Sequence, residues 1–84
     1  MQVKVYVLTV VCDAGIETVQ AFTSEEAAKE VMQDRINDEI IMAKDADCLD
    51  HVSKTNYRTI IYYEEGGWLE FSIHEDELNI PVTE

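Results

Sequence analysis

The stretch that decides the fold is SEEAAKEVMQDRINDEIIMAK, residues 24–44, which predicts one long amphipathic helix. Its apolar residues recur at intervals of three and four, as on a helix face that packs against a core. This face consists of Ala28, Val31, Met32, Ile36, Ile40 and Ala43. Thr23 and Glu26 have the spacing of a capping box, and Glu25 and Glu26 place negative charge where the helix dipole favours it. We therefore expect the helix to begin directly after Thr23.

The other side of this helix carries a row of carboxylates at successive four-residue steps. Its members, called the carboxylate stripe below, are Glu26, Glu30, Asp34 and Asp38. Like charges at this spacing destabilise a helix by roughly a few tenths of a kcal/mol per pair. Lys29 and Arg35 are expected to relieve part of the repulsion. Beyond the helix, the acidic character continues through Asp45, Asp47 and Asp50.

The composition is strongly acidic. The 84 residues contain 18 Asp and Glu against 6 Lys and Arg, which gives a net charge of -12. A chain of this length predicts a single domain, residues 1–84, that buries about 60% of its unfolded surface. The charge argues against direct binding to nucleic acid or to an anionic membrane and favours a basic partner. Improved solubility is the competing interpretation of the same charge.

The cysteines and the N-terminal segment indicate the compartment. Cys12 and Cys48 form neither a disulfide framework nor a zinc motif, so we expect reduced thiols in a cytoplasmic protein. The segment MQVKVYVLTVV, residues 1–11, is of strand type and lacks the basic region and cleavage site of a signal peptide. No segment approaches the roughly 20 apolar residues that span a bilayer.

The N-terminal segment predicts a hairpin of two strands. Residues 2–11 form the first strand, and residues 16–22 return as the second after a turn at residues 13–15. On the first strand Val3, Val5, Val7 and Val11 share one face, and Tyr6, Leu8 and Val10 share the other. Apolar residues on both faces indicate a strand in the interior of the sheet, or one whose second face makes contacts.

The C-terminal half predicts two more strands, residues 57–64 and 68–74, joined through Gly66 and Gly67. A loop at residues 45–56 precedes them, a short acidic turn at 75–79 follows them, and Pro81 ends regular structure. A connecting loop of two or four residues predicts that Ile60, Tyr62, Leu69, Phe71 and Ile73 share the face on which the helix packs. The opposite face would then carry Tyr57, Ile61, Tyr63 and Trp68 beside Glu70, Ser72 and His74.

These elements run in the order β-β-α-β-β, which predicts an α+β fold: an antiparallel sheet with the helix packed on one face. A single helix covers one face only. An open face with Tyr57, Tyr63 and Trp68 is typical of a surface that a second copy or a target protein buries.

The sequence contains no catalytic motif. With two histidines, no serine in a nucleophile elbow and no glycine-rich phosphate loop, we expect a protein that is not an enzyme and uses no cofactor. The segment from Asp45 to His51 offers several oxygen ligands but lacks the glycine and the distal glutamate of an EF-hand, so we expect no dedicated metal site. The aromatic residues could stack nucleic-acid bases, but Glu64, Glu65 and Glu70 accompany them instead of Lys and Arg, which favours a protein interface.

The carboxylate stripe supports a different hypothesis, DNA mimicry. Successive members are about 6 Å apart along the helix axis, a separation comparable to that of phosphates along one DNA strand, which rise about 3.4 Å per step along the duplex axis. A row of carboxylates on a rigid helix could therefore occupy the Lys/Arg groove of a nucleic-acid-binding protein. The alternative is a solvated helix face.

Three segments carry a resemblance to small uncharacterised proteins of phages and mobile elements. They are VYVLTV at residues 5–10, FTSEEA at 22–27 and IHEDEL at 73–78, and the resemblance covers most of the chain. Such proteins include anti-CRISPR proteins, some of which mimic DNA against the effector nuclease. The resemblance implies an inhibitory acidic surface and a location in the host cytoplasm, and it transfers no functional residue.

The sequence thus predicts a non-enzymatic acidic protein that inhibits a basic nucleic-acid-binding protein, with a CRISPR effector as one target class. The expected contact residues are Glu26, Glu30, Asp34, Asp38, Asp45, Asp47, Asp50, Tyr57, Tyr63 and Trp68. The alternative is a dimerising structural or accessory module of a phage or mobile element that uses the aromatic sheet face.

Overall fold

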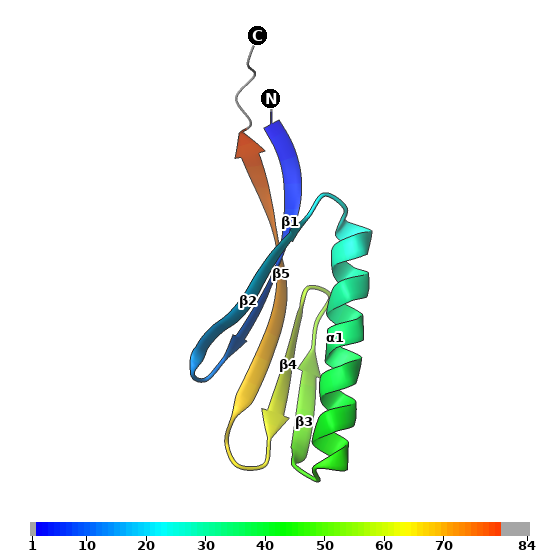
Figure 1. The fold of residues 1–84 in the computed structure, drawn as a ribbon, viewed down its shortest axis with the longest axis vertical. Helices are drawn as coiled ribbons and strands as arrows, with labels where there is room; N and C mark the ends of the chain where they lie inside the picture. Colours follow the sequence, from blue (N-terminus) through cyan, green and yellow to red (C-terminus); the bar gives the residue numbers. More distant parts are fainter. Residues whose placement is uncertain (1, 80–84) are drawn as a thin grey trace.

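The computed structural model describes residues 2–79, which form one five-stranded antiparallel sheet and one helix (Figure 1). The elements are β1 (Gln2–Cys12), β2 (Gly15–Phe22), α1 (Glu25–Asp45), β3 (Leu49–Lys54), β4 (Arg58–Tyr63) and β5 (Trp68–Asn79). The strand order is β2-β1-β5-β4-β3, and α1 packs against one face of the sheet. The predicted α+β class and the order of the predicted elements are confirmed.

Helix α1 begins one residue later than the capping box predicts. Ser24 is the N-cap: its backbone is extended, and its hydroxyl accepts a hydrogen bond from the Ala27 amide at 3.2 Å. The prediction of Thr23 as the cap was wrong, because the hydroxyl of Ser24 is the one that reaches an unpaired amide of the first turn. The predicted inner face of the helix is confirmed. Ala28, Met32, Ile36 and Ala43 are buried there, and Val31 and Ile40 pack at its margin.

The core lies between α1 and the sheet. Leu8, Ile61, Phe71 and Thr59 are its largest fully buried side chains, and they come from β1, β4 and β5. The two predicted faces of β1 are confirmed, since Leu8 and Val10 belong to the core cluster and Tyr6 packs at its edge. Burying the apolar side chains of Leu8, Ile61 and Phe71 stabilises the fold by about 1.5–3 kcal/mol each.

A strand lies where the sequence predicted a loop. Residues Leu49–Lys54 form β3, which pairs with β4 at the edge of the sheet, with an irregularity between Leu49 and His51. Leu49 and Val52 are the only large apolar side chains of this segment, so its local pattern is too weak to predict a strand. Pairing with β4 decides its conformation.

The two faces of β4 are the reverse of the prediction. Tyr62 pairs with Trp68, and the Tyr63 amide donates to the Gly67 carbonyl at 2.9 Å, so the connecting loop holds three residues, 64–66, rather than two or four. Gly66 has a φ of 95°, a conformation that glycine adopts without strain, and its amide donates to the Tyr63 carbonyl at 3.1 Å. An odd loop shifts the register by one residue and exchanges the faces. Ile61 therefore points into the core, and Ile60 and Tyr62 lie on the uncovered face.

Strand β5 continues through the predicted acidic turn. Residues 75–79 pair with residues 2–6 of β1, and this long pairing prevails over the low strand propensity of the charged residues. Residues 2–5 of β1 pair with β5 alone, so the N-terminal part of β1 and the C-terminal part of β5 extend past the helix as a two-stranded ribbon (Figure 1). Pro81, expected to end regular structure, lies outside the described residues.

Candidate interaction surfaces

The carboxylate stripe lies on the outer face of α1, away from the sheet. Glu26, Glu30, Asp34 and Asp38 are all exposed. Because a step of four residues turns by about 40° more than one full turn, the row crosses the outer face obliquely from one side to the other. The expected contact residues on the helix therefore share one continuous surface.

Lys29 and Arg35 of α1 pair with groups outside the stripe. The Lys29 ammonium pairs with Glu25 at 3.4 Å and lies 4.7 Å from the centre of the Tyr57 ring. The Arg35 guanidinium turns toward the sheet and donates to the Thr18 hydroxyl at 2.9 Å. Within residues 2–79, none of the four stripe carboxylates forms an ion pair with Lys, Arg or His. Lys29 and Arg35 therefore do not relieve the repulsion between the stripe carboxylates by pairing with them.

The acidic residues after the stripe gather near the C-terminal end of α1. Asp45 is the last residue of the helix, Asp47 follows in a turn with a φ of 54°, and Asp50 stands in β3. All three are exposed, and Asp50 Oδ2 lies 2.9 Å from His51 Nδ1. Carboxylates at a helix C-terminus oppose the helix dipole, so Asp45 and Asp47 do not stabilise α1.

The three predicted aromatic contact residues do not form one surface. Tyr57 stands beside the N-terminal part of α1, close to Lys29. Tyr63 faces the helix, and its hydroxyl donates to Glu39 at 3.4 Å. Partial burial, together with the Glu39 carboxylate, raises the pKa of Tyr63 to about 12. Only Trp68 lies on the uncovered face of the sheet.

The uncovered face carries a different set of side chains. Trp68 is joined there by Ile60 and Tyr62 of β4, and the Tyr62 ring stacks on His51 of β3 with 4.3 Å between ring centres. Val19 of the edge strand β2 lies on the same face and is 61% exposed. Only the reversed register of β4 places Ile60 and Tyr62 there, so the sequence reasoning missed them.

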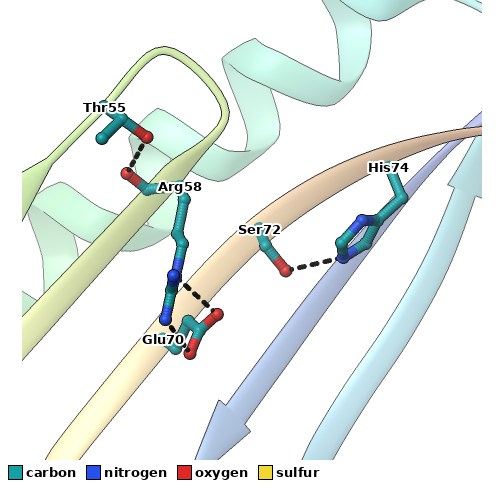
Figure 2. A network of polar contacts seen from close by, with 5 residues as sticks. All are labelled: Thr55, Arg58, Glu70, Ser72 and His74. Carbon is teal, nitrogen blue, oxygen red and sulfur yellow. Dashed lines mark hydrogen bonds and ion pairs between the residues drawn. The ribbon is translucent and has the colours of Figure 1, made fainter.

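A polar network crosses the middle of this face (Figure 2). The Arg58 guanidinium forms a bidentate ion pair with the Glu70 carboxylate, at 2.8 Å from Nε to Oε1 and 3.2 Å from Nη2 to Oε2. Next to it, Ser72 Oγ and His74 Nε2 are hydrogen-bonded at 3.1 Å. The Arg58 carbonyl accepts a hydrogen bond from Thr55 Oγ1 in the turn before β4. The network leaves the centre of the face polar but largely neutral.

A hollow of about 400 Å³ opens between the N-terminal end of α1 and β5. It is lined by Tyr6, Glu25, Tyr57, Ile73, His74 and Glu75. A hydrogen bond from the Tyr57 hydroxyl lowers the pKa of Glu25, and a hydrogen bond and ion pair with Glu75 raise the pKa of Lys4. The sequence reasoning missed this hollow because its residues come from four separate segments: β1, the start of α1, the turn before β4, and β5 with part of the predicted turn at 75–79.

The chain was compared with protein-family models, with curated proteins and with solved structures, and none of the three comparisons gives a match. Within the described residues, no helix is both long and apolar enough to cross a membrane.

Proposed function

We propose that this chain is a non-enzymatic acidic inhibitor that binds a basic nucleic-acid-binding protein through the carboxylate stripe. The observation that carries the proposal is the state of the stripe: four exposed carboxylates on one rigid helix, with the neighbouring basic side chains directed elsewhere. The resemblance to phage proteins makes a CRISPR effector the first target class to test.

Electrostatics explain why such a surface favours a basic groove. Unpaired carboxylates at four-residue spacing repel one another, and binding Lys and Arg side chains would remove this repulsion. With a net charge of -12, the whole chain steers toward a positive surface, and this attraction weakens as salt screens it. Exposed Asp45, Asp47 and Asp50 extend the same field past the end of the helix.

The experiment is a capture from host lysate at low and moderate salt with three forms of the chain. The first is the wild type, and the second carries Lys at Glu26, Glu30, Asp34 and Asp38. The third is a matched control that carries Lys at four exposed acidic residues of the two hairpin ends, Asp13, Glu17, Glu64 and Glu65. Both variants change the net charge equally.

We expect the wild type and the control variant to capture the same nucleic-acid-binding protein and the stripe variant to lose it. Circular dichroism establishes that both variants keep the fold. If the two variants lose capture equally, the total charge acts rather than the stripe, and the proposal is wrong. Equal capture by all three forms contradicts it as well.

The uncovered sheet face supports a second candidate, a dimerising accessory module. Ile60, Tyr62 and Trp68 make this face apolar at one end, and beside them, toward the middle of the face, Arg58 and Glu70 neutralise each other. Because apolar burial would drive this association, it should be insensitive to salt. Sedimentation of the wild type and of Trp68→Ala across salt concentrations tests it: a dimer lost in the variant supports this candidate, and a monomer at every concentration eliminates it.

A further inference from the structure

The edge of β5 beyond Ile73 lies beside the hollow lined by Glu25 and Glu75 and does not include the carboxylate stripe. We propose that an extended basic peptide segment of a protein partner adds to β5 as a further strand and places a Lys or Arg side chain in the hollow. This inference goes beyond the proposed function, because it concerns other residues and a different mode of recognition.

The edge of β5 is unpaired where the ribbon leaves the rest of the sheet. Strand β4 pairs with β5 from Trp68 to Ser72, and a last hydrogen bond runs from the Ile73 amide to the Tyr57 carbonyl at 2.9 Å. Because alternate residues of a strand direct their backbone groups to the same side, those of Glu75 and Glu77 point to this edge as well. No described strand pairs with them, so the edge can accept a strand from another chain.

The side chain of Asp76 marks the vacant position on this edge. Its carboxylate accepts a hydrogen bond from the Glu77 amide at 2.8 Å. In a paired strand this amide would donate to the carbonyl of a neighbouring strand. The Asp76 carboxylate thus takes the place of the carbonyl that an added strand would offer to the Glu77 amide. Because the Asp76 side chain is exposed, it can rotate away when such a strand binds.

The hollow lies directly beside the start of this edge. Its lining residues Ile73, His74 and Glu75 belong to β5, and its volume of about 400 Å³ is within the usual range of ligand pockets. Carboxylates of Glu25 and Glu75 and rings of Tyr6 and Tyr57 surround it. Carboxylates together with aromatic rings are the groups that recognise an ammonium or a guanidinium.

The chain's own lysines already use these groups. Lys29 contacts Glu25 and the face of the Tyr57 ring, and Lys4 pairs with Glu75 at 2.9 Å. The ion-pair side chains are each between about one third and three fifths exposed, so these pairs are weak and can exchange with an incoming cation.

The negative charge of the β5 edge favours a basic peptide over a second copy of the chain. In an edge-to-edge pair of two copies, the acidic run at residues 75–77 would face itself, and like charges on adjacent strands are destabilising. A strand with Lys or Arg at alternate positions would face Glu75 and Glu77 instead, since residues two apart share a face. A basic peptide therefore fits this edge, and a second copy does not.

The test uses fluorescence anisotropy with labelled peptides of about eight residues, long enough to cover the free edge. One peptide alternates Arg with Val, a second replaces Arg by Glu, and a third is the Arg peptide with alternate backbone nitrogens methylated. Methylation keeps the charge and removes the donors needed for strand pairing. We expect only the first peptide to bind tightly and to shift the NMR amide signals of Glu75 and Glu77.

Two variants of equal charge locate the cation. Glu25→Gln with Glu75→Gln should weaken binding of the Arg peptide by roughly tenfold or more, because two charge-assisted contacts are lost. Glu64→Gln with Glu65→Gln makes the same change in charge in the turn between β4 and β5, outside both proposed surfaces, and should leave the affinity unchanged. A third variant, Glu77→Pro, removes an edge donor that makes no bond to β1 and should also weaken binding.

Three results would overturn the inference. They are equal affinity for the methylated and unmethylated Arg peptides, equal losses in the two glutamine variants, and binding that leaves the Glu75 and Glu77 amide signals in place. Each of them would assign the interaction to nonspecific charge. None of them bears on capture through the stripe, which is measured with intact proteins and Lys substitutions at other residues.

Discussion

The inner and outer sides of α1 differ in what their residues do for the stability of the helix. On the inner side, Ala28, Met32, Ile36 and Ala43 are buried against the sheet, and their spacing agrees with the period of the helix. On the outer side, the stripe places like charges above one another, with no direct counterion within residues 2–79. The inner side is explained by stability, whereas the outer side works against it. This difference makes the outer side the better candidate for a function.

The largest expected effect is on the inner side. Ile36 is 3% exposed, so Ile36→Ala should lower the free energy of unfolding by about 2–5 kcal/mol through lost burial and a cavity. Ile41 lies on the same helix but is 57% exposed, and Ile41→Ala should change stability by no more than about 0.5 kcal/mol. Urea denaturation measures both. Similar losses in the two variants would contradict the assigned inner side.

The next effect appears only at high pH, at a contact between the sheet and α1. Because the folded state raises the pKa of Tyr63 from 10.0 to about 12, it favours the neutral phenol. The stability from this preference is complete below pH 10 and is lost as the pH rises from 10 to about 12. Tyr63 is only partly buried, so solvent screening reduces the effect.

Unfolding of the wild type and of Tyr63→Phe at several values of pH measures this contribution. The variant should lose less stability than the wild type between pH 10 and 12. Parallel curves would show that the Tyr63 phenol does not contribute to the alkaline transition.

A smaller effect on stability is expected at Thr59, in the part of β4 that the helix covers. Thr59 is fully buried, and its hydroxyl oxygen has no hydrogen-bond partner in the described part of the chain. Thr59→Val keeps the shape and removes the unsatisfied oxygen, so it should raise the free energy of unfolding by about 1 kcal/mol. Thr59→Ser, which keeps the hydroxyl and leaves a gap, should lower it. A loss of stability in the valine variant would indicate an undetected partner of the hydroxyl.

The smallest effect is on the outer side. Asp34 lies one turn from both Glu30 and Asp38, so Asp34→Lys replaces two repulsions by two attractions. We expect a gain of several tenths of a kcal/mol that declines with added salt. Thermal unfolding at low and high salt measures it. A destabilised variant would mean that Asp34 supports the fold, and the contrast between the two sides of α1 would disappear.

The sequence predicts the helix and its two sides well because a 21-residue helix repeats its pattern over several turns. The register of the hairpin of β4 and β5 could not be predicted in this way. One additional residue in the loop before Trp68 places Ile61 in the core and Tyr62 outside, and a pattern with apolar residues on both faces cannot exclude this register. Strand β3 and residues 75–79 depend on pairing with distant segments, which local propensity does not describe.

The same reason limits prediction of the sites. The stripe follows from one helix, and the structure places its four residues together as expected. The aromatic surface depended on the register of β4 and was wrong for Tyr57, Ile61 and Tyr63. The hollow beside β5 combines Tyr6, Glu25 and Glu75 from three elements, so only the folded chain reveals it.

The most direct test of the central claim is a competition between this chain and duplex DNA for the captured partner. The affinity of the wild-type chain for that partner is measured at rising concentrations of DNA. If the stripe occupies the nucleic-acid groove, the apparent Kd rises in proportion to the DNA concentration, and no complex contains all three components. A ternary complex, or a Kd that does not change with DNA, would contradict the claim that the outer side of α1 mimics nucleic acid.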